Sequence, residues 1–302
     1  MIQSMNGKKT ILIALIVVFI ISCHPKQHND NNMLFSKDNL VAWCIVPFDS
    51  MNRTPEERAD MLQDLGFKQF AYDWRLEHLP SFPDEIHALQ KHNIKLKSVW
   101  MWIDIDSGKI LDETNEQLLQ IIKSNNVQTD LWLGFSNKYF EGYSDEEKLT
   151  RAVDAVTYLN NRAHELGCTI SLYNHGDWFG DPVNQVRIIE KIGSGDIGIV
   201  YNFHHAHDQI EKYPELLSKM MPYLRTVNLN GMKVAGPKIL PLGSGDRELQ
   251  MLKMLKASGY SGPIGILGHV EDEDVKVVLT RNLEGLKSLL KIMGEEEALA
   301  TY

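Results

Sequence analysis

Short apolar runs alternate eight times with amphipathic stretches along this chain, and this alternation restricts its fold more than any other feature. Each apolar run has the length of a buried strand, and each following stretch has the pattern of a helix. Thr54, Pro55 and Glu57 form a capping-box signal, and Gly66 closes the helix that follows. The expected strands are 41–47, 68–73, 96–103, 130–134, 169–174, 197–203, 226–230 and 263–267, and the expected helices are 54–66, 83–92, 114–124, 144–167, 182–192, 216–224, 247–258 and 274–292.

Eight such units in about 250 residues predict a single-domain α/β fold, the (β/α)8 TIM barrel, over residues 40–293. An open doubly wound sheet is the alternative, but a nucleotide-binding one usually has a glycine-rich turn after its first strand. Residues 48–51 contain no glycine. Gly243-Ser244-Gly245 follows the seventh strand, where barrels often bind phosphate, although two glycines that simply turn the chain explain the same pattern.

The N-terminus has the pattern of an export signal rather than of a folded element. Lys8 and Lys9 precede an apolar run at residues 11–21 that is too short to span a membrane, and the run ends at Ser22-Cys23. This ending resembles a bacterial lipobox, so residues 1–23 are expected to be a lipoprotein signal peptide with Cys23 as the lipidated residue. An ordinary signal peptide or an uncleaved anchor is the alternative. We expect a flexible tether at 24–39, a tail at 294–302, and a location in a bacterial cell envelope, where the lipid is the only membrane contact.

The net charge indicates which partners are unsuitable, and the cysteine positions indicate whether a disulfide bond can form. The net charge is −9, which argues against nucleic acid as a partner, because such proteins need basic patches that neutralise phosphates. Cys44 lies in the first expected strand and Cys168 immediately before the fifth, on opposite sides of the barrel, so both are expected to be free, buried thiols. The expected partner is a small carbohydrate.

Aromatic and ionisable residues gather where the expected strands end, which is where barrels of this class have their active sites. Trp74, Trp102 and Trp178 each neighbour an aspartate, and aromatic rings beside polar groups suit a sugar, whereas Trp43 and Trp132 are expected to fill the barrel interior. Histidines also gather at this rim, at positions 175, 204, 205, 207 and 269.

These strand ends resemble the sugar phosphate isomerase/epimerase superfamily, the xylose isomerase-like barrels. The likeness lies in residues 171–176, 200–205, 227–231 and 264–269. It implies sugar chemistry and a divalent metal held by Glu, Asp, His and Glu. The matching positions here are Tyr173, Asn202, Asn228 and Gly268, which lack the charge that holds Mn²⁺ or Mg²⁺. We therefore expect this metal to be absent and no other cofactor to be needed. Within Asn202-x-x-His205, His205 takes the place of the family's substrate-binding histidine.

The chemistry implied by the resemblance is proton transfer next to the carbonyl of a sugar or keto-sugar, as in an isomerase, an epimerase or a lyase. His175 and His205 are the expected catalytic residues, since imidazole is a base near neutral pH. A zinc site made by His175, His205 and His269 is one alternative, and a non-catalytic sugar-binding lipoprotein is another. Family members that cleave abasic DNA are disfavoured by the acidic charge. The expected substrate-binding residues are Asp73, Trp74, Trp102, Asp104, Asn174, Trp178, Asn202, His204, Asn228, Asn230, Lys233 and His269.

Overall fold

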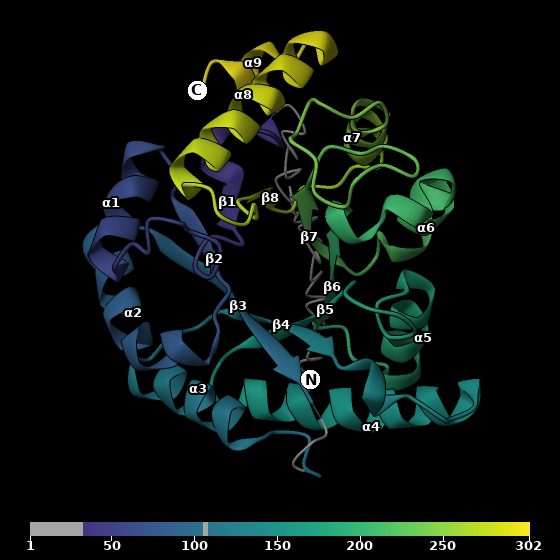
Figure 1. Cartoon of the computed structure of the whole chain (residues 1–302). Coiled ribbons are helices and arrows are strands. Elements are labelled where there is room, and N and C mark those ends of the chain that lie inside the picture. Colours follow the sequence, from purple (N-terminus) through teal and green to yellow (C-terminus); the bar gives the residue numbers. More distant parts are fainter. Residues whose placement is uncertain (1–32, 105–107) are drawn as a thin grey trace, which may run out of the picture.

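A computed structural model describes residues 33–104 and 108–302, and within them eight parallel strands close into a barrel in sequence order (Figure 1). The closure is made by β1 and β8, which pair from Leu40 with Ile264 to Trp43 with Leu267. The TIM barrel expected from the alternating pattern is confirmed. The strands are β1 (Leu40–Trp43), β2 (Gln69–Tyr72), β3 (Lys95–Ile103), β4 (Asp130–Phe135), β5 (Thr169–Tyr173), β6 (Ile197–Asn202), β7 (Leu224–Leu229) and β8 (Ile264–Leu267).

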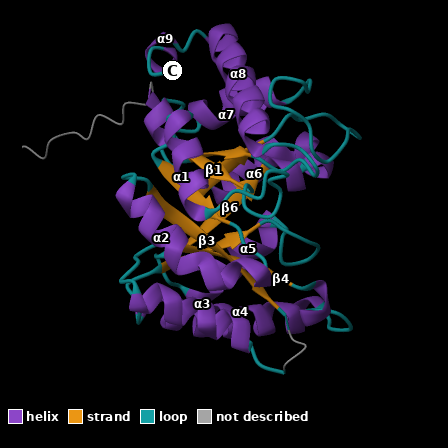
Figure 2. Ribbon diagram, turned by 60° about the vertical axis from the view of Figure 1, so that its left-hand side comes forward, coloured by secondary structure: helices purple, strands orange, loops and turns teal. Residues whose placement is uncertain are grey.

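Helices surround the barrel as an outer layer (Figures 1 and 2). The α-helices are α1 (Pro55–Asp64), α2 (Phe82–Lys91), α3 (Glu113–Ser124), α4 (Asp145–His164), α5 (Pro182–Ile192), α6 (Tyr213–Met220), α7 (Glu248–Ala257), α8 (Val275–Met293) and α9 (Glu296–Leu299). Short 3-10 helices are η2 (Lys37–Asn39), η3 (Leu76–Ser81), η4 (Asn137–Tyr139), η5 (Phe203–His205) and η6 (His207–Lys212). No helix of the described segments is long and apolar enough to cross a membrane.

Local signals fix most of the helix ends. The Thr54–Glu57 capping box begins α1, and Gly193 ends α5 in the left-handed conformation that glycine adopts without strain. The helix expected at 216–224 is displaced, because Pro214 in its first turn starts α6 at Tyr213. Residue 224 belongs instead to β7, where it pairs with Ile199.

Aromatic side chains fill the inside of the barrel and leave one end for a site. We call the end where the strands terminate the upper end of the barrel, and the end where they begin the lower end. The rings of Trp43 and Trp132 meet edge to face, with centroids 4.8 Å apart, and Tyr173 stacks against Trp132. Both tryptophans are buried, as expected. Below them, Asp130 accepts hydrogen bonds from Trp132 Nε1 (3.1 Å) and Ser171 Oγ (2.6 Å). The interior is thus a packed core rather than a channel.

The two ends of the described chain close the lower end of the barrel. Leu34 and Phe35 are buried, Lys37 N donates to Thr301 Oγ1 (2.8 Å), and Tyr302 Oη donates to Phe35 O (2.9 Å). The flexible tether expected over 24–39 is therefore wrong for residues 33–39, and the tail expected at 294–302 is folded, because both segments cover apolar surface. The expected signal peptide with Cys23, and residues 24–32, lie outside the described residues.

Candidate active site

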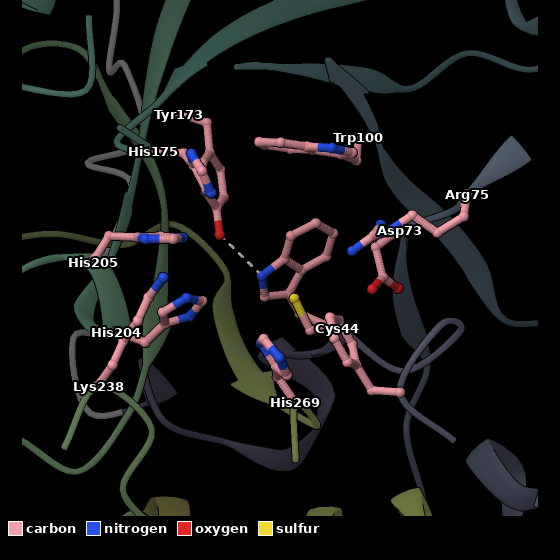
Figure 3. Close-up of a pocket in the computed structure, with 12 residues that line it drawn as sticks. Cys44, Asp73, Arg75, Trp100, Tyr173, His175, His204, His205, Lys238 and His269 are labelled. Carbon is pink, nitrogen blue, oxygen red and sulfur yellow. Dashed lines mark hydrogen bonds between the residues drawn. The ribbon is translucent and has the colours of Figure 1, made fainter. Parts of the chain in front are cut away.

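A pocket of about 110 Å³ lies where the strands end, and we call it the mouth pocket (Figure 3). Its lining residues lie in the strands, as Trp43, Trp100 and Tyr173 do, or in the loops that follow them, which is where barrels of this class have their active sites. It contains four of the histidines expected at this rim. The lining residues are Trp43, Cys44, Phe48, Asp73, Arg75, Trp100, Tyr173, His175, His204, His205, Lys238 and His269.

The four histidines form a connected group of rings. His205 contacts His175 and His204, with ring centroids 4.4 and 3.8 Å apart, and His269 stacks on Phe48 at 3.5 Å. Burial, reinforced by the charges of Lys238 and Arg75, lowers the pKa of His175 and of His269 to about 4. Burial also lowers the pKa of His204 and of His205. All four imidazoles are therefore neutral at neutral pH and can accept hydrogen bonds, and burial makes each of them a weaker base than a free imidazole.

Two cationic side chains enter the pocket from opposite sides, Arg75 and Lys238 (Figure 3). Arg75 Nη1 donates to Trp74 O (2.8 Å), and its guanidinium lies over the Phe48 ring at 5.5 Å. Within residues 33–104 and 108–302, neither cation forms an ion pair with a carboxylate. The pocket therefore has a positive charge that the protein does not neutralise with a salt bridge.

The position of Lys238 corrects the expectation that Lys233 would serve the site. Lys233 is exposed and lines neither the mouth pocket nor its neighbour, and its carbonyl oxygen lies 3.1 Å from His207 Nδ1. Asn230 Nδ2 donates to Lys238 O (3.0 Å), and Asn230 Oδ1 accepts from Leu240 N (3.3 Å). Asn230, expected to bind substrate, thus positions the loop that presents Lys238.

One carboxylate lines the pocket, that of Asp73, and its residue is only 2% exposed. Its Oδ1 accepts from Ile45 N (3.1 Å) and Val46 N (3.2 Å), whereas Oδ2 is buried without a partner. Burial raises the pKa of Asp73 to about 6. Beside it, Cys44 is a free, buried thiol with positive φ whose pKa burial raises well above its usual value. Cys168 is also free and buried, as expected.

The four positions that match the metal ligands of the family hold only uncharged residues here, and two of them, Tyr173 and Asn202, are hydrogen-bonded to each other. Tyr173 Oη accepts hydrogen bonds from Trp43 Nε1 (3.2 Å) and from Asn202 Nδ2, and Asn202 Oδ1 accepts from His204 N (3.2 Å). The Asn228 side chain is buried with neither polar atom hydrogen-bonded. Gly268 offers no side chain, and a Cβ there would collide with Ile45. This donor set contains no carboxylate and no imidazole, so it does not fit a divalent cation.

The alternative zinc site is not assembled either. Among the described residues, the single group of three His, Cys, Asp or Glu whose ligand atoms approach within 4.8 Å is Glu56, Asp60 and His92. That group lies on the surface, where the Glu56 carboxylate already pairs with Lys91 and His92. His175, His205 and His269 line one pocket but do not bring three nitrogen atoms that close together.

A second hollow of about 430 Å³, which we call the outer cavity, adjoins the mouth pocket and shares Arg75, Trp100 and His175 with it. Trp102 stacks on Trp100 with centroids 5.9 Å apart, and Trp74 Nε1 donates to Trp100 O (2.8 Å). Trp74 and Trp102 therefore line the outer cavity, and their expected role in binding the substrate stays a prediction. The outer cavity is lined by Trp74, Arg75, Leu76, Trp100, Trp102, Asp112, Thr114, Asn115 and His175.

Three expected site residues lie elsewhere. Trp178 Nε1 donates to Asp145 Oδ1 (2.8 Å), which holds this ring in a separate surface hollow beside Phe140. Asn174 is buried and exchanges hydrogen bonds with the backbone of Asn202, from Asn202 N (2.7 Å) and to Asn202 O (3.0 Å), so it clamps β5 to β6. Asp104 directly follows β3 and lines neither the mouth pocket nor the outer cavity.

Sequence reasoning missed several lining residues. Arg75 stands next to Trp74 at the end of β2, so the strand-end argument that found Asp73 should also have found it. Trp100 points into the pocket from β3. Lys238 had no sequence signal, because it lies far along the loop between β7 and α7.

Comparison with known proteins agrees with this fold. The family model for the xylose isomerase-like TIM barrel matches residues 59–289. A 3-keto-D-glucoside 4-epimerase from E. coli has a similar structure, with a TM-score of 0.62 and 15% identity over 84% of this chain and 100% of that chain. A D-tagatose 3-epimerase-like protein gives a TM-score of 0.61 and 15% identity over 85% and 98%.

The IOLI protein, solved with a bound zinc atom, gives a TM-score of 0.60 and 13% identity over 84% of this chain and 98% of that chain. At these identities, the structural matches show a shared fold. No curated protein sequence matches this chain. The family model covers most of the barrel, and the chain therefore belongs to the xylose isomerase-like TIM barrel family.

Proposed function

We propose that this protein is a carbohydrate-active enzyme that transfers a proton next to the carbonyl of a sugar or keto-sugar, without a divalent metal. The family and the similar structures, which include sugar epimerases, support a sugar substrate. The observation that carries the proposal is the pair of neutral imidazoles, His175 and His205, 4.4 Å apart in the mouth pocket.

In this mechanism a neutral imidazole, His205 or its neighbour His175, accepts the proton from the carbon beside the carbonyl. The electron pair of the broken C–H bond moves onto the carbonyl oxygen, which becomes an enediolate oxyanion. The Lys238 ammonium, whose charge acts on His204 and His205, stabilises that oxyanion in the role that the metal serves in the family.

The direction from which the proton returns selects the reaction. His269 lies on a different wall from His175 and His205 (Figure 3), so it can pass a proton taken from water to the opposite face of the same carbon, while the first imidazole gives its proton to water, and this completes an epimerisation. Return of the proton by the first imidazole to the former carbonyl carbon gives an isomerisation, in which the hydroxyl proton of the deprotonated carbon moves to the former carbonyl oxygen and a new carbonyl forms at the deprotonated carbon. Loss of a substituent, with its bonding electron pair, from the carbon on the other side of the deprotonated carbon restores the original carbonyl and gives a lyase reaction.

Export to the cell envelope of a bacterium, with a lipid on Cys23, is part of the proposal. The apolar run at residues 11–21 and the lipobox-like Ser22-Cys23 support it. Cys23→Ser should release the protein from the membrane fraction and remove the lipid mass from its N-terminus. Unchanged partitioning and mass would contradict the anchor.

The decisive experiment is exchange of deuterium from ²H₂O into the sugar, followed by NMR over a panel of aldoses, ketoses, keto-glycosides and uronates. We expect exchange at the carbon next to the carbonyl, and its loss in His205→Asn. His164→Asn is the matched control, because His164 is an exposed residue paired with Asp196, outside the site. A sugar that binds without exchange would establish the non-catalytic sugar-binding alternative, which the depressed imidazole basicity favours.

A further inference from the structure

The phosphate position of this barrel is already filled by the protein itself. Barrels often hold phosphate on backbone N–H groups after the seventh strand. Here the carboxylate of Glu248, a residue 1% exposed, accepts from Gly245 N (2.8 Å) and Met232 N (3.0 Å). A Cβ on Gly245 would collide with Glu248 and with the Met232 carbonyl. The glycine pair is therefore a tight turn around an internal carboxylate, with no room for an external phosphate.

The mouth pocket nevertheless has the charge of an anion site. The chain as a whole has a net charge of −9, yet the pocket is lined by two cations and by the single carboxylate of Asp73. One Asp73 oxygen is occupied by the backbone of Ile45 and Val46, and Arg75 and Lys238 have no carboxylate partner in the described part of the chain. Arg75 and Lys238 are both exposed at the rim of this pocket, so they stay in contact with water, and an anionic ligand would gain an attraction to them that a neutral ligand would not.

Arg75 has the geometry to bind an anionic group of a substrate. It lines both the mouth pocket and the outer cavity, so a group bound to it can connect the two. Its hydrogen bond to Trp74 O and its contact with the Phe48 ring fix the guanidinium plane and leave further N–H groups available. A planar, pre-oriented guanidinium suits a carboxylate, which accepts two parallel hydrogen bonds.

We propose that the substrate of this site is a sugar acid, either a uronate or its glycoside, whose carboxylate is bound by Arg75. Trp100 and Trp102 line the outer cavity beside Arg75, where an apolar sugar face can stack. Lys238 lies beside His204 and His205, so it acts on the part of the same sugar where the proton is transferred. The sugar class rests on the proposed function, whereas the carboxylate site of Arg75 is tested by binding alone.

The test is calorimetric titration of the full chain with matched pairs, glucuronate against glucose and galacturonate against galactose, with glucose 6-phosphate as a third arm. We expect at least one uronate to bind about tenfold or more tightly than its neutral partner, as a charge-assisted bidentate contact should produce. Arg75→Gln should abolish this preference, and Arg75→Lys should keep only part of it. Lys233→Gln removes an exposed charge from the loop that also carries Lys238, and it should leave binding unchanged.

Three outcomes overturn the proposal: equal binding of neutral sugars and uronates, a uronate preference that survives Arg75→Gln in a protein with normal thermal stability, or a preference for glucose 6-phosphate. The exchange experiment separates this failure from failure of the proposed function. Uronate binding without deuterium exchange contradicts the proposed enzymatic function, and it still supports the carboxylate site. Deuterium exchange that occurs only with neutral sugars, and that Arg75→Gln does not change, contradicts the carboxylate site. The proposed enzymatic function would still hold.

Discussion

Glu248→Ala is expected to destabilise the barrel strongly while it leaves the mouth pocket intact. The substitution leaves Gly245 N and Met232 N without their acceptor in a buried corner. Each unpaired buried group costs about 1–3 kcal/mol, so the loss of both partners should lower the free energy of unfolding by roughly 2–6 kcal/mol. For a domain of this size, about 2–4 °C of melting temperature is lost per kcal/mol, which gives a decrease of roughly 4–24 °C.

Urea denaturation and thermal melts, followed by circular dichroism, measure this effect. The control is Glu215→Ala, which removes an exposed glutamate from the first turn of α6, where it pairs with Lys219, and which should cost under about 1 kcal/mol. Inorganic phosphate should partly restore the melting temperature of Glu248→Ala, because the emptied backbone cradle can bind it, and should leave the wild type unchanged. The reasoning is refuted if the Glu248 variant is as stable as the Glu215 control.

Three further predictions concern the mouth pocket. Uronate affinity should rise roughly three- to tenfold as the pH falls from 7 to 5. The reason is that Asp73, with a pKa of about 6, loses its negative charge over this range, and a titration series with Asp73→Asn should show no such step. EDTA should change neither turnover nor melting temperature, because Tyr173, Asn202, Asn228 and Gly268 form no cation site, and one tightly bound Mn²⁺ per chain in elemental analysis would contradict this. His175→Ala and His205→Ala should each lower turnover by about 10²–10⁴-fold. Each should cost less than about 2 kcal/mol of folding free energy, and variants that unfold would instead identify these rings as packing residues.

The barrel was predictable because its determinants are local. The α1 capping box and the regular return of apolar runs depend on neighbouring residues, and they place most elements within a few residues of their observed bounds. The same logic placed His175, His205 and His269 at one rim, because the ends of parallel strands meet there.

What could not be predicted depends on contacts between distant parts of the chain. The path of the loop after β7 is set by Asn230 and His207, and these contacts bring Lys238 rather than Lys233 to the pocket. Trp178 follows β5 as a sugar-binding residue would, but Asp145 at the start of α4 holds it away from the mouth. The local sequence pattern shows neither the contacts of Asn230 and His207 nor the contact between Trp178 and Asp145.

The pairing of the two chain ends beneath the barrel determines how an anchored molecule would face its surroundings. Met33 enters at the lower end, where Phe35 meets Tyr302, and the mouth pocket lies at the other end of the strands. If Cys23 holds a lipid, residues 24–32 allow at most about 30 Å between the bilayer surface and the barrel floor. The lipid would then be linked to the end of the barrel opposite the mouth pocket, so that the point of attachment itself would not cover the entrance.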